Sequence, residues 1–380
     1  MQGLDRRQFL RLSALTGATV AAAAVIPRFS LAEVKKASLT DCLNMSPQEM
    51  AERSKLVMDS WAYLRKGAES IRGAKLRGQV FGILDNPAPT FTSRMMDAAH
   101  RKATYDQLVQ AGFLKDVALE AFLPRHSDPN KSPQPFLSAP GSGYQSHHSY
   151  PGGLVTHTAL NVKVSLALYE GYKETYGYEL DRDVVVASQV LHDLHKPWVF
   201  QWGPSGESRT ELSLAGTGEH HPYSVAESIY RGLPPVVIVA QACAHEHPGT
   251  PRDEKGPVNW IKAASILAGV DPVGKGLLAQ AGDTLPLPRR QENFVCHLGD
   301  HDWVLSVPAA KWIIPVMKEI AAEKYGLPQT GGDENEKVKK FNALRNYVFS
   351  QATIMHLYQV YGAKGKQALT EMVTSIVVPA

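Results

Sequence analysis

The sequence has 380 residues, with 40 basic and 37 acidic side chains and a formal net charge of +3 at pH 7. The surplus lies in the first 32 residues, and the rest of the chain has 36 basic and 36 acidic residues. A neutral chain gives no global electrostatic case for nucleic-acid binding. About 350 residues can bury a substantial core in one domain or two.

Residues 1–32 have the pattern of an export signal. Residues 5–11 read DRRQFLR, an apolar run rich in alanine follows, and Ser30, Leu31 and Ala32 offer a cleavage site. The apolar run from 12 to 26 has fifteen residues, fewer than the roughly twenty that span a bilayer. We therefore expect export by the twin-arginine machinery, cleavage, a periplasmic or secreted protein, and no stable membrane anchor.

The remaining chain has helical periodicity almost throughout, which predicts an all-α fold. A loop rich in Pro, Ser and Gly covers residues 124–151 and is the best boundary candidate. We expect an N-terminal helical region at 33–130, a metal-binding domain at 131–300 and a C-terminal helical region at 301–380. The predicted helices cover about residues 46–74, 91–119, 153–172, 183–195, 222–231, 234–245, 260–270, 309–325 and 334–374.

The three cysteines, Cys42, Cys243 and Cys296, are an odd set for an oxidising compartment. One disulfide and one free thiol are compatible with the sequence, which does not pair them. No two of them have the spacing of a zinc ribbon.

Histidines concentrate in the middle of the chain, where nine of the fourteen lie between residues 147 and 247. The central feature is the adjacent pair His192 and Asp193, because both can bind one metal ion and the aspartate can bridge to a second. Each candidate falls near the end of a predicted helix, so several helix ends can converge on one cleft. The predicted metal ligands are His157, His192, Asp193, His221, His245 and Asp271.

Imidazole and carboxylate ligands favour Mn, Fe, Co or Zn, whereas an all-carboxylate site would favour Mg or Ca. One or two divalent ions held here can activate water and orient a phosphate. Lys196 follows His192 by one helical turn, where it can bind an anionic substrate or stabilise a leaving oxygen. Asp193 and Lys196 are the predicted catalytic residues.

The order of these motifs resembles the HD-domain superfamily of metal-dependent phosphohydrolases. The resemblance covers about residues 142–274 and rests on YPGGLVTHT at 150–158, LHDLHK at 191–196, HP at 221–222, AHEH at 244–247 and VDP at 270–272. It implies an all-α HD core with added N-terminal and C-terminal helices, and one or two metal ions.

The sequence also departs from the usual pattern. His195 stands where glycine is usual, and it can be a further ligand, a proton carrier or a solvent-facing residue. His220 competes with His221, and His247 with His245, for a second ion. His297 and His301 lie near Asp300 and Asp302, a stretch that we expect to be a surface loop.

Three functions follow. The first is hydrolysis of a phosphate ester or anhydride in a nucleotide or other small phosphorylated compound. The second is oxidation, because some members of the superfamily use a di-iron site to cleave C–C or C–P bonds. The third is a non-catalytic binding module that retains a metal.

Overall fold

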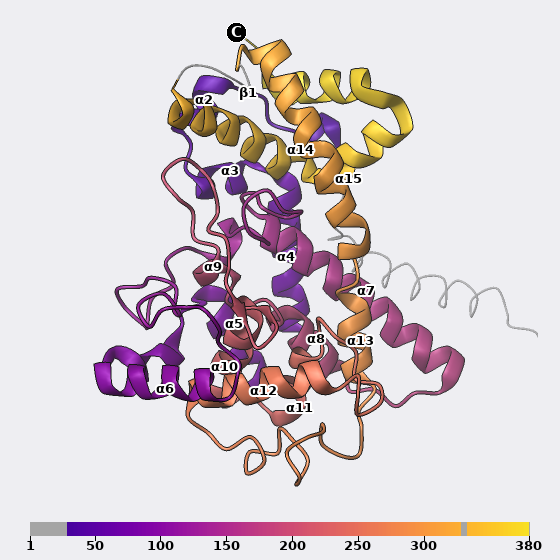
Figure 1. Cartoon of the computed structure of the whole chain (residues 1–380). Coiled ribbons are helices and arrows are strands. Elements are labelled where there is room, and N and C mark those ends of the chain that lie inside the picture. Colours follow the sequence, from indigo (N-terminus) through magenta and orange to yellow (C-terminus); the bar gives the residue numbers. More distant parts are fainter. Residues whose placement is uncertain (1–28, 328–332, 380) are drawn as a thin grey trace, which may run out of the picture.

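The computed structural model describes residues 29–327 and 333–379, which form an all-α protein (Figure 1). In these ranges the strands are two short pairs: β1 (Ala37–Ser38) is parallel to β4 (Val377–Val378), and β2 (Ser213–Leu214) is antiparallel to β3 (Thr217–Gly218). The predicted export signal lies outside the described residues except for its last four positions. None of the described helices is both long and apolar enough to cross a membrane.

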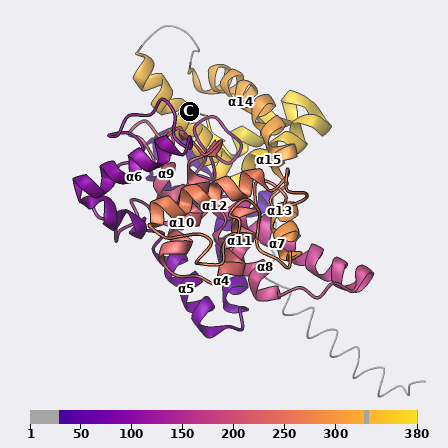
Figure 2. The same ribbon diagram turned by 60° about the horizontal axis from the view of Figure 1, so that its bottom comes forward.

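The larger of two hydrophobic cores surrounds the predicted ligands. The helix α7 (Gly153–Tyr176) packs against α4 (Lys55–Glu69), α8 (Arg182–Leu191) and α13 (Glu292–Gly299). On the other side of α8, α11 (Pro235–Ala242) contacts α10 (His220–Tyr230), which lies along α12 (Lys255–Ala268) (Figure 2). The remaining elements of this part are η2 (Thr90–Met96), η3 (Phe136–Ser138), α5 (Ala74–Asp85), α6 (Ala98–Gln110) and α9 (Lys196–Val199).

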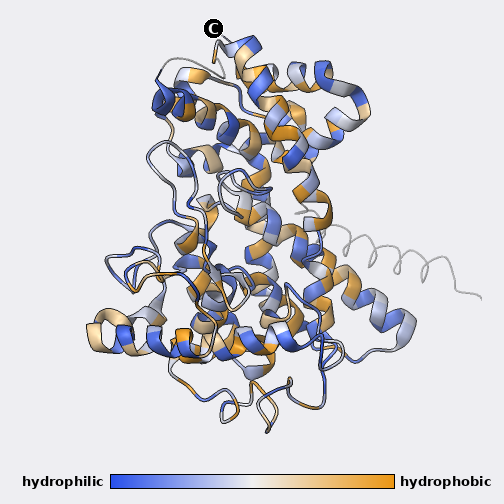
Figure 3. Ribbon diagram, viewed as in Figure 1, coloured by the Kyte–Doolittle hydropathy of each residue, from blue (hydrophilic) through white to orange (hydrophobic). Residues whose placement is uncertain are grey.

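The smaller core joins the two ends of the described chain. It forms where α14 (Trp303–Tyr325) packs against α15 (Glu334–Ile376), and α15 in turn contacts α2 (Leu39–Asn44) and α3 (Pro47–Arg53). Figure 1 shows this as indigo and yellow segments that meet at one end of the molecule, and Figure 3 shows hydrophobic residues along α14. Ahead of β1 lies the short turn η1 (Leu31–Glu33).

The two cores do not follow the predicted division at residues 130 and 300. α4 and α5 contact α8 in the larger core, whereas α2 and α3 contact the C-terminal helix α15. The N-terminal region is thus shared between both cores because its short helices are amphipathic and find different apolar partners. Both α3 and α4 contact α15, so they link the two cores.

Most predicted helices are present with shifted ends, but the stretch 46–74 is divided into α3 and α4, and within 91–119 the α-helix α6 covers only Ala98–Gln110. The stretch 183–195 is not one helix, since α8 ends at Leu191 and His192 begins a turn that leads into α9. The helices α2, α5, α9 and α13 were not predicted. The longest element, α15, contains non-helical backbone at Thr353 and Gly365. None of the three cysteines, all within the described ranges, forms a disulfide, and all three are buried.

Candidate metal centre

The turn between α8 and α9 presents the His192–Asp193 pair. The last eight residues of α8 are buried on every side, which fixes the position of its C-terminus in the larger core. The Nδ1 atom of His192 lies 2.7 Å from the carbonyl oxygen of Gln189. Because a carbonyl only accepts, Nδ1 must donate, and the lone pair of Nε2 remains available for a metal ion.

The first turn of α7 brings His157 to this pair. A Cβ on Gly153 would lie 2.0 Å from the carbonyl oxygen of His148, so the preceding loop crosses the helix at a distance that only glycine permits. The preceding residue, Gly152, has φ +82 and a Cβ there would lie 2.5 Å from the Val57 side chain. These two close approaches explain the glycine pair and set the direction in which His157 enters the larger core.

Four side chains meet in the buried interior around one carboxylate oxygen. The Oδ2 atom of Asp193 lies 3.2 Å from His157 Nε2 and 3.0 Å from His192 Nε2. A second carboxylate comes from the end of α13, where Asp300 Oδ1 lies 3.2 Å from His157 Nε2 and 3.4 Å from His192 Nε2. Two imidazoles and two carboxylates thus face one point.

The other oxygen of Asp193 faces a second pair of imidazoles. Its Oδ1 atom lies 3.3 Å from His220 Nε2 and 3.8 Å from His245 Nε2. The Nε2 atom of His245 is also 3.3 Å from Asp300 Oδ2. His220 is oriented by Glu211, whose Oε2 atom lies 2.5 Å from its Nδ1. The residues that can hold a metal ion are therefore His157, His192, Asp193, His220, His245 and Asp300.

The charges in this cluster depend on one another. Burial favours neutral imidazoles, but the carboxylates of Asp193 and Asp300 outweigh it and raise the pKa of His192 to about 9. Burial also opposes ionisation of Asp193, yet His192 and Lys196 hold its pKa well below the usual range. The Nζ atom of Lys196 lies 2.5 Å from Asp193 Oδ2, one turn along the chain.

The cluster has the features of a cation site. Within the described ranges, Asp193 Oδ1 and His220 Nε2 have no hydrogen bond of good geometry, and Asp193 Oδ2 has only its ion-pair contacts with Lys196, His157 and His192. Buried polar atoms are rarely left in this state, so each one needs an explanation. A metal ion provides it, because it accepts lone pairs from several such atoms at once.

Asp271 is not part of the cluster, and here the structure corrects the sequence prediction. Its side chain is exposed at the surface, where its carboxylate accepts hydrogen bonds from the backbone N–H groups of Val273 and Gly274. Asp300 takes the expected place. The stretch that contains Asp300 is therefore not a surface loop, since Asp300 is 6 % exposed.

The structure also separates the competing histidines. His221 is fully buried, with its Nε2 3.4 Å from the carbonyl oxygen of Gln241 and its ring against Trp260, so His220 rather than His221 faces Asp193. His247 is exposed, whereas His245 lies in the cluster.

His195 belongs to a different environment. Its ring is fully buried against Trp198, and its Nε2 atom lies 3.5 Å from Glu227 Oε2. It is therefore not solvent-facing, and its acidic neighbour is Glu227 rather than Asp193.

Three polar residues of the centre were missed by the sequence reading: Asp300, Asp302 and Asn161. Asp302 Oδ1 lies 3.4 Å from His157 Nδ1, and its Oδ2 lies 3.2 Å from His148 Nε2. A carboxylate behind a metal-binding histidine fixes the ring orientation. Two features of the sequence could have indicated these residues. Residues 300–302 read Asp-His-Asp, and Asn161 follows His157 by one helical turn.

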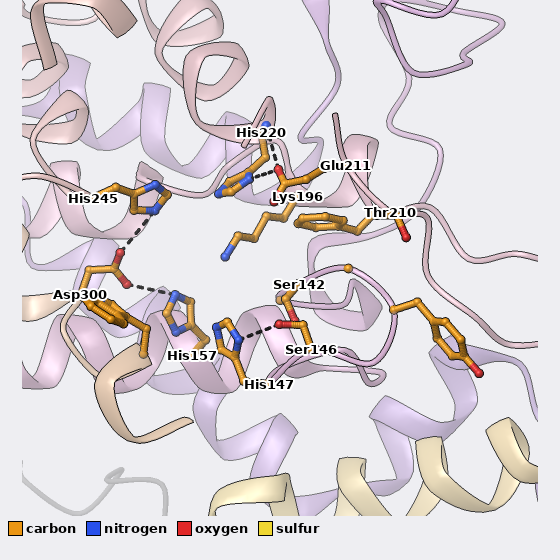
Figure 4. A pocket seen from close by; sticks show the side chains of 15 residues that line it. Ser142, Ser146, His147, His157, Lys196, Thr210, Glu211, His220, His245 and Asp300 are labelled. Atoms are coloured by element: carbon orange, nitrogen blue, oxygen red, sulfur yellow. Dashed lines mark hydrogen bonds and ion pairs between the residues drawn. The ribbon is translucent and has the colours of Figure 1, made fainter. Parts of the chain in front are cut away.

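A cavity of about 400 Å³ opens onto the cluster. Figure 4 shows the Lys196 side chain extending into it, between His220, His245 and His157. The wall contains aromatic side chains and several hydroxyl groups. The side chains that line it away from the cluster are Ser142, Tyr144, Ser146, His147, Phe200, Thr210 and Trp303.

The fold and the cluster define an all-helical protein with a buried histidine–aspartate site that can hold a metal ion. The chain is a distant homologue of a phosphodiesterase: it is 29% identical over 184 residues to dihydroneopterin 2',3'-cyclic phosphate phosphodiesterase of Methanocaldococcus jannaschii. The aligned part covers 48% of this chain and 58% of that enzyme, so it spans little more than half of the relative. No protein-family model and no solved structure matches the chain.

Proposed function

We propose that this protein is a metal-dependent phosphohydrolase of the HD superfamily that cleaves a phosphate ester or anhydride of a small compound. The observation that carries the proposal is the Asp193 carboxylate, which lies between two groups of imidazoles and beside a lysine at the floor of an open cavity. The homologous enzyme is a phosphodiesterase, which supports hydrolysis over the oxidative chemistry of other superfamily members.

His157, His192, Asp193 and Asp300 would hold one divalent ion, and Asp193, His220 and His245 a second. When bound, such ions lower the pKa of water and offset negative charge on a phosphoryl group. The mixed nitrogen and oxygen donors suit Mn, Fe, Co or Zn. The chain's own contribution is to hold these donors in a buried place where electrostatic interactions are strong.

Lys196 has a defined task in this proposal. Its side chain is 7% exposed and its Nζ atom is close to Asp193. A lysine amine is a compact positive charge, and at the floor of the cavity it attracts an anionic phosphate and stabilises charge that develops on a leaving oxygen. The aromatic side chains of Tyr144, Phe200 and Trp303 provide apolar surface for the rest of the substrate.

The location is a separate proposal. The twin-arginine pattern at residues 5–11 supports export to the periplasm or outside the cell. This route carries folded proteins, so the chain would acquire its metal before export. A fusion of residues 1–32 to a reporter, compared with an Arg6→Lys, Arg7→Lys version, tests it: export must depend on the arginine pair.

The experiment for the activity uses the purified chain, Mn²⁺ or Co²⁺, and a panel of substrates. The panel contains bis-p-nitrophenyl phosphate, nucleoside 2',3'-cyclic phosphates, dihydroneopterin 2',3'-cyclic phosphate and nucleotides. We expect metal-dependent hydrolysis that is lost in Asp193→Asn and kept in Asp271→Asn, a matched change of an exposed aspartate. Equal activity in both variants would contradict the proposal, and substrate-dependent oxygen uptake by iron-loaded protein would assign oxidation instead.

A further inference from the structure

Asn161 lies inside the metal centre, although it is not part of the histidine–aspartate motifs of the sequence. It is fully buried on α7, one turn after His157. Its Nδ2 atom lies 2.6 Å from Asp300 Oδ1, 3.2 Å from His157 Nε2 and 3.5 Å from His192 Nε2. The amide therefore points at the place where three candidate donor atoms converge.

These distances match the spacing of atoms that share one ion. Donors that surround a metal at about 2.1 Å in octahedral geometry lie about 3 Å from their neighbours. The nitrogen and oxygen donors of His157, His192, Asp193 and Asp300 are 3.0 to 3.4 Å apart in five contacts between them. The Nδ2 atom of Asn161 lies 2.6, 3.2 and 3.5 Å from three of them, close to this spacing, so a donor atom in its place would be within reach of the same ion.

The second observation concerns the amide oxygen. Asn161 Oδ1 is buried and has no hydrogen-bond partner among the described residues, and a buried amide oxygen without a donor costs about 1–3 kcal/mol. Without a cation, the N–H groups of the amide donate to Asp300 and face the ring nitrogens of His157 and His192. With a cation present, the same N–H groups would point at positive charge, which is unfavourable.

A half-turn about the Cβ–Cγ bond exchanges the two amide atoms at almost no steric cost. It removes the N–H groups from the cation and directs the orphaned oxygen at it. We propose that Asn161 is a further ligand of the metal centre, which binds a divalent ion through its amide oxygen. In the metal-free site the side chain donates a hydrogen bond to Asp300. In the metal-bound site it supplies a neutral oxygen ligand.

This inference rests on the proposed metal centre, and its test measures binding of Mn²⁺ alone, without a substrate. Asn161→Leu removes both amide atoms at similar volume, and Asn161→Asp keeps an oxygen but removes the N–H donors. We expect Asn161→Leu to weaken Mn²⁺ binding about tenfold or more, and Asn161→Asp to bind at least as tightly as the unchanged chain. If only the N–H bond to Asp300 mattered, Asn161→Asp would place two carboxylates together and lose affinity as well.

The added charge of Asn161→Asp strengthens cation binding by itself, so a second readout is needed. The visible spectrum of bound Co²⁺ reports the number of ligands, and we expect Asn161→Leu to shift it toward the stronger absorption of lower coordination. Asn44→Asp in α2, within the other core, controls for the charge change. Thermal unfolding in chelator verifies that each variant is folded.

The outcomes separate two failures. If the unchanged chain and Asp193→Asn bind Mn²⁺ equally, the metal centre itself is wrong. If the unchanged chain binds and Asp193→Asn does not, while Asn161→Leu keeps both the affinity and the Co²⁺ spectrum, only the role of Asn161 is refuted. Loss of affinity in Asn161→Asp equal to that in Asn161→Leu also refutes it.

Discussion

The Nε2 atom of His220 lies 3.3 Å from Oδ1 of Asp193, whereas His157 and His192 make their closest contacts with Oδ2. One buried carboxylate thus serves two groups of imidazoles through its two oxygens. This is the arrangement that a bridging ligand between two cations requires. It also makes the choice between the adjacent histidines of α10 testable.

His220→Asn and His221→Asn are expected to have opposite effects. The first removes the imidazole that faces Asp193, so we expect Mn²⁺ affinity to fall about tenfold or more, with little loss of stability. The second removes a buried hydrogen bond to the Gln241 carbonyl and should cost about 1–3 kcal/mol of unfolding free energy. Calorimetric titration and urea unfolding in chelator measure both. Weaker metal binding in His221→Asn alone would restore the original assignment.

Lys196→Met should separate catalysis from metal retention. The variant keeps the length of the side chain but removes the charge beside Asp193, so we expect the turnover rate to fall about 10²-fold. The metal content, measured after dialysis, should stay unchanged or rise, because Lys196 competes with a cation for Asp193. Lys163→Met, an exposed lysine on α7, is the control. An unchanged rate would remove Lys196 from the mechanism.

Two glycines of α7 form a matched pair. Gly153→Ala places a methyl group 2.0 Å from the His148 carbonyl oxygen, so the loop or the helix must move. We expect a loss of about 1–3 kcal/mol together with weaker metal binding, because His157 follows on the same turn. Gly171→Ala meets nothing within 4 Å and should stabilise the helix by about 0.5–1 kcal/mol. Thermal unfolding measures the stability of both variants. Equal stability of Gly153→Ala and Gly171→Ala would contradict the close approach of the loop to Gly153.

Metal binding should depend on pH in a defined direction. Burial opposes protonation of both imidazoles, but nearby carboxylates raise the pKa of His192 and of His220 to about 9 in the metal-free chain. At neutral pH these rings carry protons that a metal ion must displace. Affinity should therefore rise from about pH 6 toward pH 9, with proton release. Mn²⁺ calorimetry in two buffers of different ionisation enthalpy measures it, and a pH-independent affinity would argue against His192 and His220 as ligands.

Much of the fold and part of the site could be predicted from local pattern. The apolar run of α8 and its terminal His192–Asp193 pair form a dense signal, and the glycine pair marks the start of α7, although the contact of Gly152 with Val57 appears only in the structure. Lys196 follows from helical spacing. These features depend on neighbours in the sequence.

The remaining ligands depend on contacts between distant segments. Asp271 and Asp300 both follow apolar helical stretches, so their local sequence does not distinguish them. Asp271 accepts a hydrogen bond within an exposed turn. Asp300 lies at the end of α13, which packs on α7 and brings this residue into the larger core. Asn161 escaped notice because asparagine within a helix is usually a solvated residue, and only its burial beside three donors gives it significance.

The parallel pairing of Ala37–Ser38 with Val377–Val378 has a consequence for biosynthesis. α2 can find its neighbours on α15 only after the ribosome has made residues 334–376. The segments around the metal ligands are complete earlier, so their assembly can begin while the tail is still being made. We therefore expect the smaller core to close after the larger one, when β4 pairs with β1 and α15 packs on α2.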